Sequence, residues 1–189
     1  MKPLDVIENV TDAETWNDAI WINQELKVFF VPIWRCGNTT FMEDVATKLN
    51  FELVKHTDVT DYYGIAFIRN PRKRLPSQIW IAHKHRGVPI QTLIENLNNT
   101  LPLDEHFIKQ TDFLTGYNID CYIDLDNLSN DYDNPVVNGI VEIMHISRRH
   151  AVDDDSRRSI TDIINDQANH EIIETYITLD MLMWKENTK

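Results

Sequence analysis

The sequence predicts an α/β domain, a three-layer sandwich in which helices cover both faces of a mainly parallel sheet. Short apolar, β-branched runs alternate with segments whose apolar residues recur at helical spacing, as in strands joined by helices. Polar turns follow two of the runs, at Trp34–Asn38 and Arg69–Pro71. A chain of 189 residues, 42% of them hydrophobic, is long enough for one core, so we expect a single domain over residues 1–189.

Strands are expected where the apolar runs are short and rich in β-branched or aromatic residues. The first clear one, Lys27–Ile33, is the uninterrupted run typical of a strand buried in a parallel sheet. Phe51–Lys55, Tyr63–Ile68 and Ile119–Leu125 have similar length and composition. Ligands of such sheets bind where the carboxyl ends of strands turn into helices, so we expect a site at the turns after the first and third of these strands.

Helices are expected between the strands and after the last one. Pro71–Arg86 begins with a proline, which suits a first helical turn, and its apolar residues share one face. Thr39–Leu49 has the same periodicity, and Thr40 with Glu43 predicts a capping box at its start. The remaining expected helices are Ile90–Asn98, Asp104–Leu114 and segments within Ser156–Asn165 and His170–Lys185.

The charge of the chain is acidic overall but unevenly spread. A net charge of −12 opposes general nucleic-acid binding, which needs a broad basic surface. Between Tyr62 and Ile94, however, there is no Asp or Glu, whereas several of the 18 lysines and arginines fall there. This acid-free window favours a compact anionic ligand, and the alternative is an ordinary solvated helix face. Its cations are Arg69, Arg72, Lys73, Arg74, Lys84 and Arg86.

Cysteine usage and hydropathy favour a cytoplasmic protein without a metal site. The 2 cysteines cannot build a disulfide framework, and no CxxC or Cys/His cluster suggests zinc. The longest apolar runs are strand-sized, so we expect no membrane contact. The N-terminus lacks a basic segment followed by an apolar stretch, so we expect no secretory signal.

The turn after the first strand has the composition of a phosphate site. A helix N-terminus presents unpaired N–H groups, glycine permits close approach of the backbone, and arginine adds a fixed charge. The GxxxxGK[ST] spacing of a Walker A loop is absent, and no lysine follows the glycine. A plain capped helix explains the same residues. The predicted phosphate-binding residues are Arg35, Cys36, Gly37, Asn38, Thr39 and Thr40.

A second set of polar residues follows the strand Tyr63–Ile68. Arg69 comes directly after the strand, Asn70-Pro71 turns the chain, and Ser77 lies about two helical turns further on. An arginine at a strand end and a serine on the following helix can hold one phosphate together. The alternative is an ion-paired surface arginine and an ordinary helix serine.

Together these motifs resemble the signatures of the sulfotransferases that use 3′-phosphoadenosine 5′-phosphosulfate (PAPS). Pro32…Arg35-Cys-Gly-Asn-Thr-Thr40 is similar to the family's strand–turn–helix for the 5′-phosphosulfate. Arg69-Asn-Pro71, with Arg74 and Ser77, is similar to its grip on the 3′-phosphate. The resemblance implies a P-loop nucleotide-kinase-like core, PAPS as co-substrate, and Arg35–Thr40, Arg69 and Ser77 as the residues that bind it.

Later segments resemble the carbohydrate-modifying branch of this family. His106–Gln110 is similar to its His-x-x-x-Gln segment, Ile119–Leu128 to the strand and helix after it, and Ile172–Asp180 to its closing Ile-x-x-x-Tyr-x-x-Asp helix. The resemblance spans roughly residues 27 to 184. It implies a hydroxyl acceptor, on a sugar in that branch.

Two departures concern the first motif. The family's lysine, which follows the charge on the bridging oxygen as it breaks, is replaced by Arg35, and arginine is not an interchangeable donor. One extra residue, Trp34, also separates Pro32 from the basic residue.

In-line sulfuryl transfer also needs a base for the incoming hydroxyl. We predict His56 as this base, because it ends the strand between the two motifs. His106 and Glu105 are the alternatives. Arg35 is predicted to stabilise the leaving phosphate.

The predicted function is therefore sulfuryl transfer from PAPS to a hydroxyl acceptor, with no nucleic-acid partner and no metal requirement. An ATP- or GTP-dependent phosphotransferase on the same core is the first alternative. It would be expected to carry a Walker lysine and a magnesium-holding aspartate at a strand end. The second alternative is a non-catalytic nucleotide-binding module, for which the arginine at position 35 is the main indication.

Overall fold

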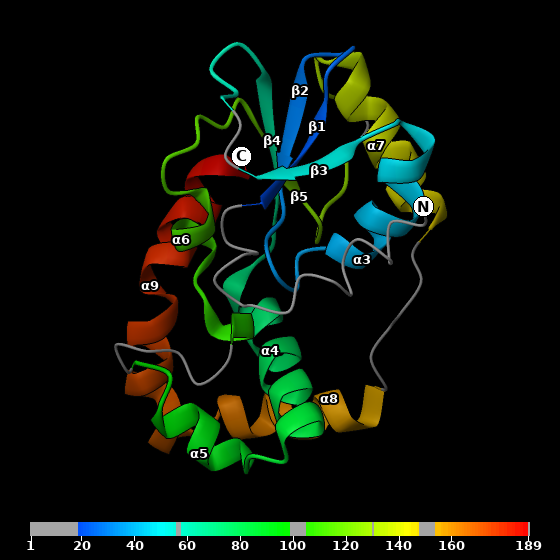
Figure 1. Cartoon of the computed structure of the whole chain (residues 1–189). Coiled ribbons are helices and arrows are strands. Elements are labelled where there is room, and N and C mark those ends of the chain that lie inside the picture. Colours follow the sequence, from blue (N-terminus) through cyan, green and yellow to red (C-terminus); the bar gives the residue numbers. More distant parts are fainter. Residues whose placement is uncertain (1–18, 56–57, 99–104, 130, 148–153, 189) are drawn as a thin grey trace. The chain divides into compact units, whose positions relative to one another are not determined.

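The computed structural model describes residues 19–55, 58–98, 105–129, 131–147 and 154–188 (Figure 1). Side chains are described for all of these except residues 105 and 154–158. The contacts of the chain divide it into two compact units. Unit 1 comprises Met1–Ile68 with Phe113–Arg149 and contains the sheet, and unit 2 comprises Arg69–Asp112 with His150–Lys189 and is helical.

The sheet of unit 1 has five strands in the order β3-β1-β2-β4-β5. β2 pairs in parallel with β4, and β4 with β5, whereas β1 is antiparallel to both β2 and β3. All the strands except β1 therefore run in one direction, and their carboxyl ends lie at one edge. The strands are β1 (Ala19–Asn23), β2 (Val28–Val31), β3 (Glu52–Lys55), β4 (Tyr63–Ile68) and β5 (Cys121–Asp124).

The α/β class expected from the sequence is confirmed, but the sheet is mixed in its pairings. The difference is β1, which was not among the expected strands although all five of its residues are buried. It pairs antiparallel with β2, with Asn23 opposite Val28, and occupies the position between β2 and β3. Because neighbouring strands are about 4.8 Å apart, β1 separates β3 from β2 by roughly 10 Å.

The helical elements of unit 1 follow β2 and β5. Asn38–Thr40 forms α3 and continues directly into the π-helical segment η1 (Phe41–Ala46), which packs against α7 (Pro135–Ile146). α7 is not among the helices expected from the sequence. The signal for it is present, since Asn134 caps the helix by accepting from the N–H of Val136 and the buried positions recur at helical spacing. These buried residues are Val137, Ile140, Val141 and Met144.

Unit 2 is built around α4 (Pro71–Arg86), which packs against α5, α8 and α9. The segment expected as one helix over 104–114 is instead a 3₁₀ turn, η2, followed by α6, whose last residues belong to unit 1. The remaining elements are α5 (Ile90–Glu95), η2 (Glu105–Phe107), α6 (Gln110–Leu114), α8 (Asp154–Ile164), η3 (Gln167–Asn169) and α9 (His170–Asn187).

Local signals fix both ends of α4 where the sequence predicts them. Asn70 is the N-cap and its side chain accepts from the N–H of Arg72, while Pro71 occupies the first turn. Gly87 ends the helix in the left-handed conformation, with φ +66°, and its N–H donates to the carbonyl of His83.

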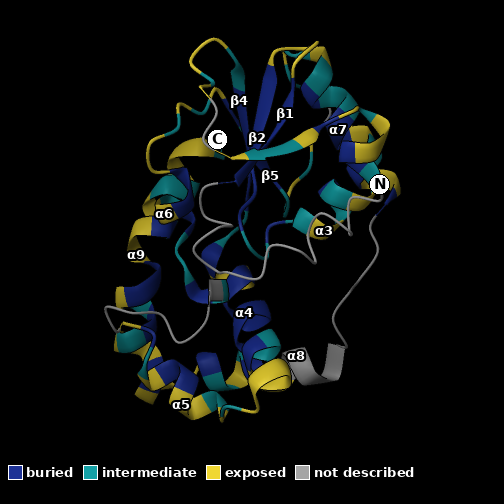
Figure 2. Cartoon of the chain, viewed as in Figure 1, coloured by how far each residue is buried: buried dark blue, intermediate teal, exposed yellow. Residues whose placement is uncertain are grey.

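Each unit has its own apolar core, as the buried colour of the strands and of the inner faces of the helices shows (Figure 2). In unit 1 the ring of Phe41 stacks on Phe30 at 3.8 Å between centroids and meets Phe51 and Phe67 edge to face. η1 is thereby held on the sheet directly after the candidate phosphate turn. The core of unit 2 joins α4, α5, α8 and α9 through Leu75, Ile79, Leu93, Ile160 and Ile177.

Over the described parts of the chain, we find no helix with both the length and the apolar character needed to cross a membrane.

Candidate functional site

The turn after β2 has an unusual backbone. Arg35 has φ 64° and Gly37 has φ 73°, so both lie in the left-handed region, which a residue with a Cβ occupies at a cost of about 1–2 kcal/mol. A Cβ at Gly37 would come within 3.0 Å of Leu125, 3.1 Å of Met144 and 3.3 Å of Phe67. Only glycine therefore fits this position, and the turn lies closely against β4 and α7.

The turn leads into α3 in a way that leaves the start of the helix open. The N–H of Phe41 donates to the carbonyl of Gly37 at 2.9 Å, and the N–H groups of the preceding helical residues have no acceptor within the helix. The predicted capping box is wrong, because Gly37 is the N-cap and no side chain caps the helix. Thr40 is already helical, so it does not occupy the capping position.

The residues of this turn differ in what they can offer to a ligand. Thr39 is exposed and Arg35, Gly37 and Thr40 are partly exposed. Cys36 is buried, and its N–H donates to the carbonyl of Ile33 at 3.0 Å, so it supports the turn from within. If the N–H of Cys36 is to bind a phosphate, as predicted, it must give up its hydrogen bond to the carbonyl of Ile33.

The turn has backbone features that suit a bound phosphate or sulfate group. Its backbone can approach an anion closely at Gly37, a cationic side chain stands two residues earlier, and the first N–H groups of α3 follow. The side-chain Oδ1 of Asn38 is buried and has no hydrogen-bond partner among the described residues. An amide oxygen only accepts hydrogen bonds, so this atom cannot pair with an anionic phosphate and adds nothing to the fit.

The left-handed backbone of Arg35 gives a stability prediction. Arg35→Gly and Arg35→Ala both remove the guanidinium, but only glycine adopts φ 64° without strain. We expect Arg35→Gly to be more stable than Arg35→Ala by about 1 kcal/mol. Urea unfolding of the two variants measures the difference, and an Arg35→Ala variant as stable as Arg35→Gly would show that the turn has a different backbone.

The second motif begins directly after β4, where the side chain of Gln110 holds the backbone of Arg69. The N–H of Arg69 donates to Oε1 of Gln110 at 2.9 Å, and Nε2 of Gln110 donates to the carbonyl of Arg69 at 3.0 Å. The side chain of Arg69 is partly exposed, whereas Ser77 on α4 is 2% exposed. A phosphate bound here would therefore meet Arg69 more readily than the hydroxyl of Ser77.

Arg74, which the resemblance includes in the second motif, lies in the interior of unit 2. It is 1% exposed, its guanidinium donates to the carbonyl of Ile108 at 2.8 Å, and it forms an ion pair with Asp180 at 3.5 Å. A buried cation needs such a partner, because an unpaired charge in the core is strongly destabilising. Arg74 thus serves the packing of α4 on α9 instead of facing a ligand.

Two other cations of the acid-free window, Arg72 and Lys84, also have interaction partners within unit 2. Arg72 forms an ion pair with Glu174 of α9, and the ammonium of Lys84 lies 4.5 Å from the ring centre of Trp80. The pairing of Arg72 and the burial of Arg74 show that these two cations have structural partners, while the anionic-ligand interpretation stays a prediction. Arg72 and Arg74 meet acids that are distant in sequence, and Arg69 follows the strand end as the phosphate hypothesis requires.

The predicted bases have different positions. His56 lies outside the described residues, although Lys55, which precedes it, ends β3 at the edge where β2 and β4 also end. His106 is in η2 of unit 2, partly exposed, and its carbonyl accepts from Nε2 of Gln78. Glu105 precedes it in the same turn. His56 and Arg35 belong to unit 1, and His106 and Arg69 to unit 2.

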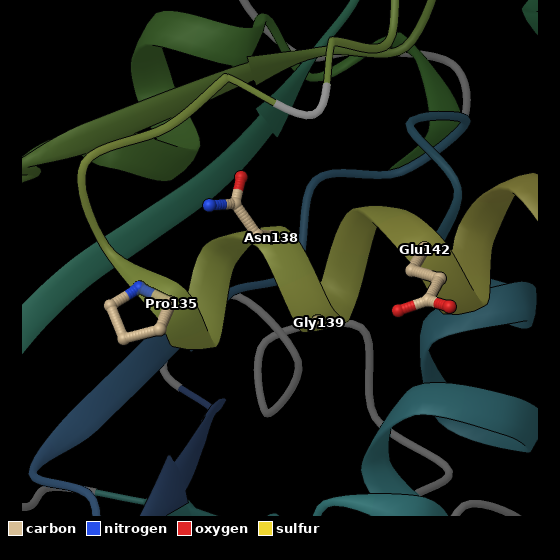
Figure 3. A pocket seen from close by; sticks show the side chains of 4 residues that line it. All are labelled: Pro135, Asn138, Gly139 and Glu142. Carbon is tan, nitrogen blue, oxygen red and sulfur yellow. The ribbon is translucent and has the colours of Figure 1, made fainter.

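A surface hollow of about 400 Å³ lies on α7, and none of the predicted site residues is among the residues that line it (Figure 3). Pro135, Asn138, Gly139 and Glu142 line it. The amide of Asn138 is already bonded to the backbone N–H and carbonyl of Tyr132 at 3.1 and 2.7 Å, and among the described residues that line the hollow only the acid Glu142 is ionisable. The hollow therefore has no donor set suited to an anion.

Other kinds of site receive little support from the described residues. No group of three or more His, Cys, Asp or Glu among them could hold a metal ion. Both cysteines are buried, and burial raises the pKa of Cys121 to about 11, so its thiol stays protonated at neutral pH and is a poor nucleophile.

No protein-family model, no curated protein and no solved structure matches this chain.

Proposed function

We propose that this protein is a PAPS-dependent sulfotransferase that acts on a hydroxyl group, with a sugar as the expected acceptor. The observation that carries the proposal is the pairing of β2 with β4. These strands are adjacent and parallel, with Val31 opposite Ala66, so the Arg35–Thr40 turn and the Arg69 turn both leave the sheet at its carboxyl edge. The proposal includes a three-layer, nucleotide-kinase-like arrangement of the core.

Each motif has a distinct task in this proposal. PAPS supplies the activated sulfuryl group when bound. The N–H groups at the start of α3 and the guanidinium of Arg35 hold the 5′-phosphosulfate and stabilise the charge on the departing phosphate. Arg69 binds the 3′-phosphate, which ATP lacks, and Ser77 on α4 is the second predicted partner of that phosphate.

A phosphotransferase that uses ATP or GTP is the second candidate, and Asp124 favours it. Asp124 ends β5 at the same edge of the sheet, with 9% of its surface exposed, and is a carboxylate of the kind that holds magnesium. However, its Oδ1 already accepts from the N–H of Asp126 at 3.0 Å. The parallel neighbour of β2 is β4, which is followed by the cation Arg69, so the first candidate accounts for more of the residues at this edge.

The expected effect of Arg69→Ala tests the nucleotide assignment. A charge-assisted hydrogen bond contributes about 1.5–3 kcal/mol, so removing the guanidinium is expected to weaken binding of adenosine 3′,5′-bisphosphate about ten- to a hundredfold. Titration calorimetry of the bisphosphate with both proteins measures the change. Binding of adenosine 5′-monophosphate (AMP), which has no 3′-phosphate, is expected to change little.

Arg72→Ala is the matched control, because Arg72 is an exposed arginine in the first turn of α4, three residues after Arg69, and is paired with Glu174. It removes the same formal charge and is expected to leave bisphosphate affinity within about twofold. Equal losses in the two variants would show a general charge effect and would refute a specific grip by Arg69.

A further inference from the structure

The side chain of Gln110 makes two hydrogen bonds to the backbone of Arg69, and the proposed function assigns no role to them. β5 continues the ladder of β4 as far as the carbonyl of Ile68, which accepts from the N–H of Leu125 at 3.0 Å. At the next residue the side-chain amide of Gln110 takes over and bonds both the N–H and the carbonyl of Arg69, at 2.9 and 3.0 Å. Gln110 is fully buried, at 0% exposure. One side chain thus fixes both peptide groups that flank the Cα of Arg69.

Gln110 is itself held by Asp180 of α9. The carboxylate accepts from the N–H of Gln110 at 2.9 Å and from the N–H and hydroxyl of Thr111 at 3.0 and 3.2 Å. Asp180 is 2% exposed and has the buried guanidinium of Arg74 as its counter-ion. A carboxylate at the start of α6 satisfies N–H groups that would otherwise lack acceptors.

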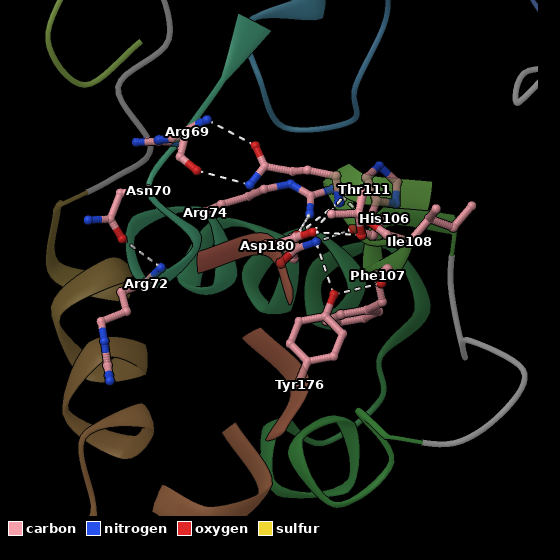
Figure 4. Close-up of polar contacts among 12 residues, drawn as sticks. Arg69, Asn70, Arg72, Arg74, His106, Phe107, Ile108, Thr111, Tyr176 and Asp180 are labelled. Atoms are coloured by element: carbon pink, nitrogen blue, oxygen red, sulfur yellow. Dashed lines mark hydrogen bonds and ion pairs between the residues drawn. The ribbon is translucent and has the colours of Figure 1, made fainter. Parts of the chain in front are cut away.

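The turn before Gln110 is fixed by Tyr176, one helical turn before Asp180. Its hydroxyl donates to the carbonyl of Phe107 at 2.6 Å. Burial raises the pKa of Tyr176 to about 12, so the phenol keeps its proton, and this donor, at all ordinary pH values. In Figure 4 the ring of Tyr176 lies below Phe107, and the side chain of Arg69 points away from Asp180. The two hydrogen bonds from Gln110 therefore reach Arg69 through its backbone.

We propose that Gln110, held by Asp180, is a positioning residue that orients Arg69 toward the 3′-phosphate of the nucleotide. This inference rests on the proposed function. A guanidinium binds a phosphate through two parallel N–H···O bonds, which form only when the guanidinium is placed accurately. The orientation of the two peptide groups that flank Arg69 sets the direction in which its side chain leaves the backbone. Because the backbone of Arg69 is already fixed in the free protein, nucleotide binding does not have to lose the conformational entropy of ordering it.

The test is the preference for adenosine 3′,5′-bisphosphate over AMP, measured as a ratio of dissociation constants. Gln110→Met keeps the length of the side chain and removes both bonds to Arg69. We expect the preference to fall about tenfold while AMP affinity stays within twofold. In an Arg69→Ala background, Gln110→Met is expected to leave the preference unchanged, because the group that it positions is already absent.

Gln78→Met is the matched control for burial. Gln78 is 1% exposed, and its side-chain amide donates to the carbonyl of His106 and to the hydroxyl of Tyr176, not to the backbone of Arg69. It is expected to lower the melting temperature without changing the preference. If Gln110→Met does not fold, the same ratio is measured with Gln110→Glu, which keeps the acceptor for the N–H of Arg69 and loses the donor to its carbonyl. A reduced preference is expected there too.

The outcomes separate this inference from the proposed function. A wild-type chain that binds the bisphosphate no better than AMP contradicts the proposed function. A clear preference in the wild type that persists in the folded Gln110 variant overturns the positioning role alone. A preference that falls by the same factor in the Arg69→Ala background also overturns it, because the effect then does not pass through Arg69.

Discussion

Replacing His56 with alanine is expected to lower the rate of sulfuryl transfer by about 10²–10⁴, the usual cost of removing a general base. A sugar hydroxyl is a poor nucleophile at neutral pH, and an imidazole is the side chain best matched to take its proton. The assay is transfer from PAPS to p-nitrophenyl glycosides at saturating donor. Affinity for adenosine 3′,5′-bisphosphate is expected to remain normal, because the base faces the acceptor.

The sheet topology bears on this prediction through Lys55. β3 runs in the same direction as β2 and β4, so Lys55 ends its strand at the edge where both turns begin, and His56 is the next residue. His106→Ala is the comparison variant and is expected to lose less turnover. If His56→Ala keeps nearly full activity while His106→Ala loses it, the base is His106, and if both retain activity Glu105 is the next candidate.

Arg35→Ala is expected to reduce turnover about 10²–10³-fold while weakening donor binding much less. The reason is that charge on the departing phosphate develops as the S–O bond breaks, so a cation placed there acts mainly on the transition state. Measuring kcat separately from the dissociation constant of the bisphosphate distinguishes the two effects. The left-handed backbone conformation of Arg35 sets the direction in which its side chain leaves the turn.

Arg35→Lys supplies the control for charge. Lysine is the residue of the resembled family at this point, so the variant is expected to recover much of the rate lost in Arg35→Ala, or to exceed the wild type. Unchanged turnover in Arg35→Ala would contradict the assignment. It would transfer the role to another cation, with Lys55 at the end of β3 the next to test.

The parts of the fold that were predictable are those with local signals. The bounds of β4 and α4 agree with the prediction, because Asn70-Pro71 starts the helix, Gly87 stops it, and the strand is a plain apolar run. β3 and β5 lie within the ranges expected for them. Capping residues and short apolar runs act within a few residues of where they stand, so a single sequence contains them.

The parts that were missed depend on partners distant in the chain. The apolar run Ala19–Asn23 is visible in the sequence, but only its pairing with Phe29 and Val54 on either side makes it a central antiparallel strand. The ion pair between Arg74 and Asp180 joins residues 106 positions apart. No local pattern distinguishes Arg74 from the neighbouring arginines, so its burial could not be predicted.

The candidate site shows the same division. The glycine of the first turn was predicted, and the structure gives the physical reason in its positive φ and the close contact with Leu125. The clamp of Gln110 on Arg69 was not predicted, because it is made between a side chain and a backbone 41 residues apart. The family resemblance singled out the segments that contain Gln110 and Asp180, but it implied no role for either residue.

The most direct test of the central claim is the nucleotide selectivity of the unmodified chain. Adenosine 3′,5′-bisphosphate, ATP and GTP, the latter two with magnesium, are compared at equal concentration for the rise in melting temperature, followed by calorimetry of any that bind. A ligand that binds only the native state raises its stability in proportion to RT ln(1 + [L]/Kd). The sulfotransferase account predicts a clear rise with the bisphosphate and little with ATP or GTP. Binding of ATP as tight as that of the bisphosphate would contradict it.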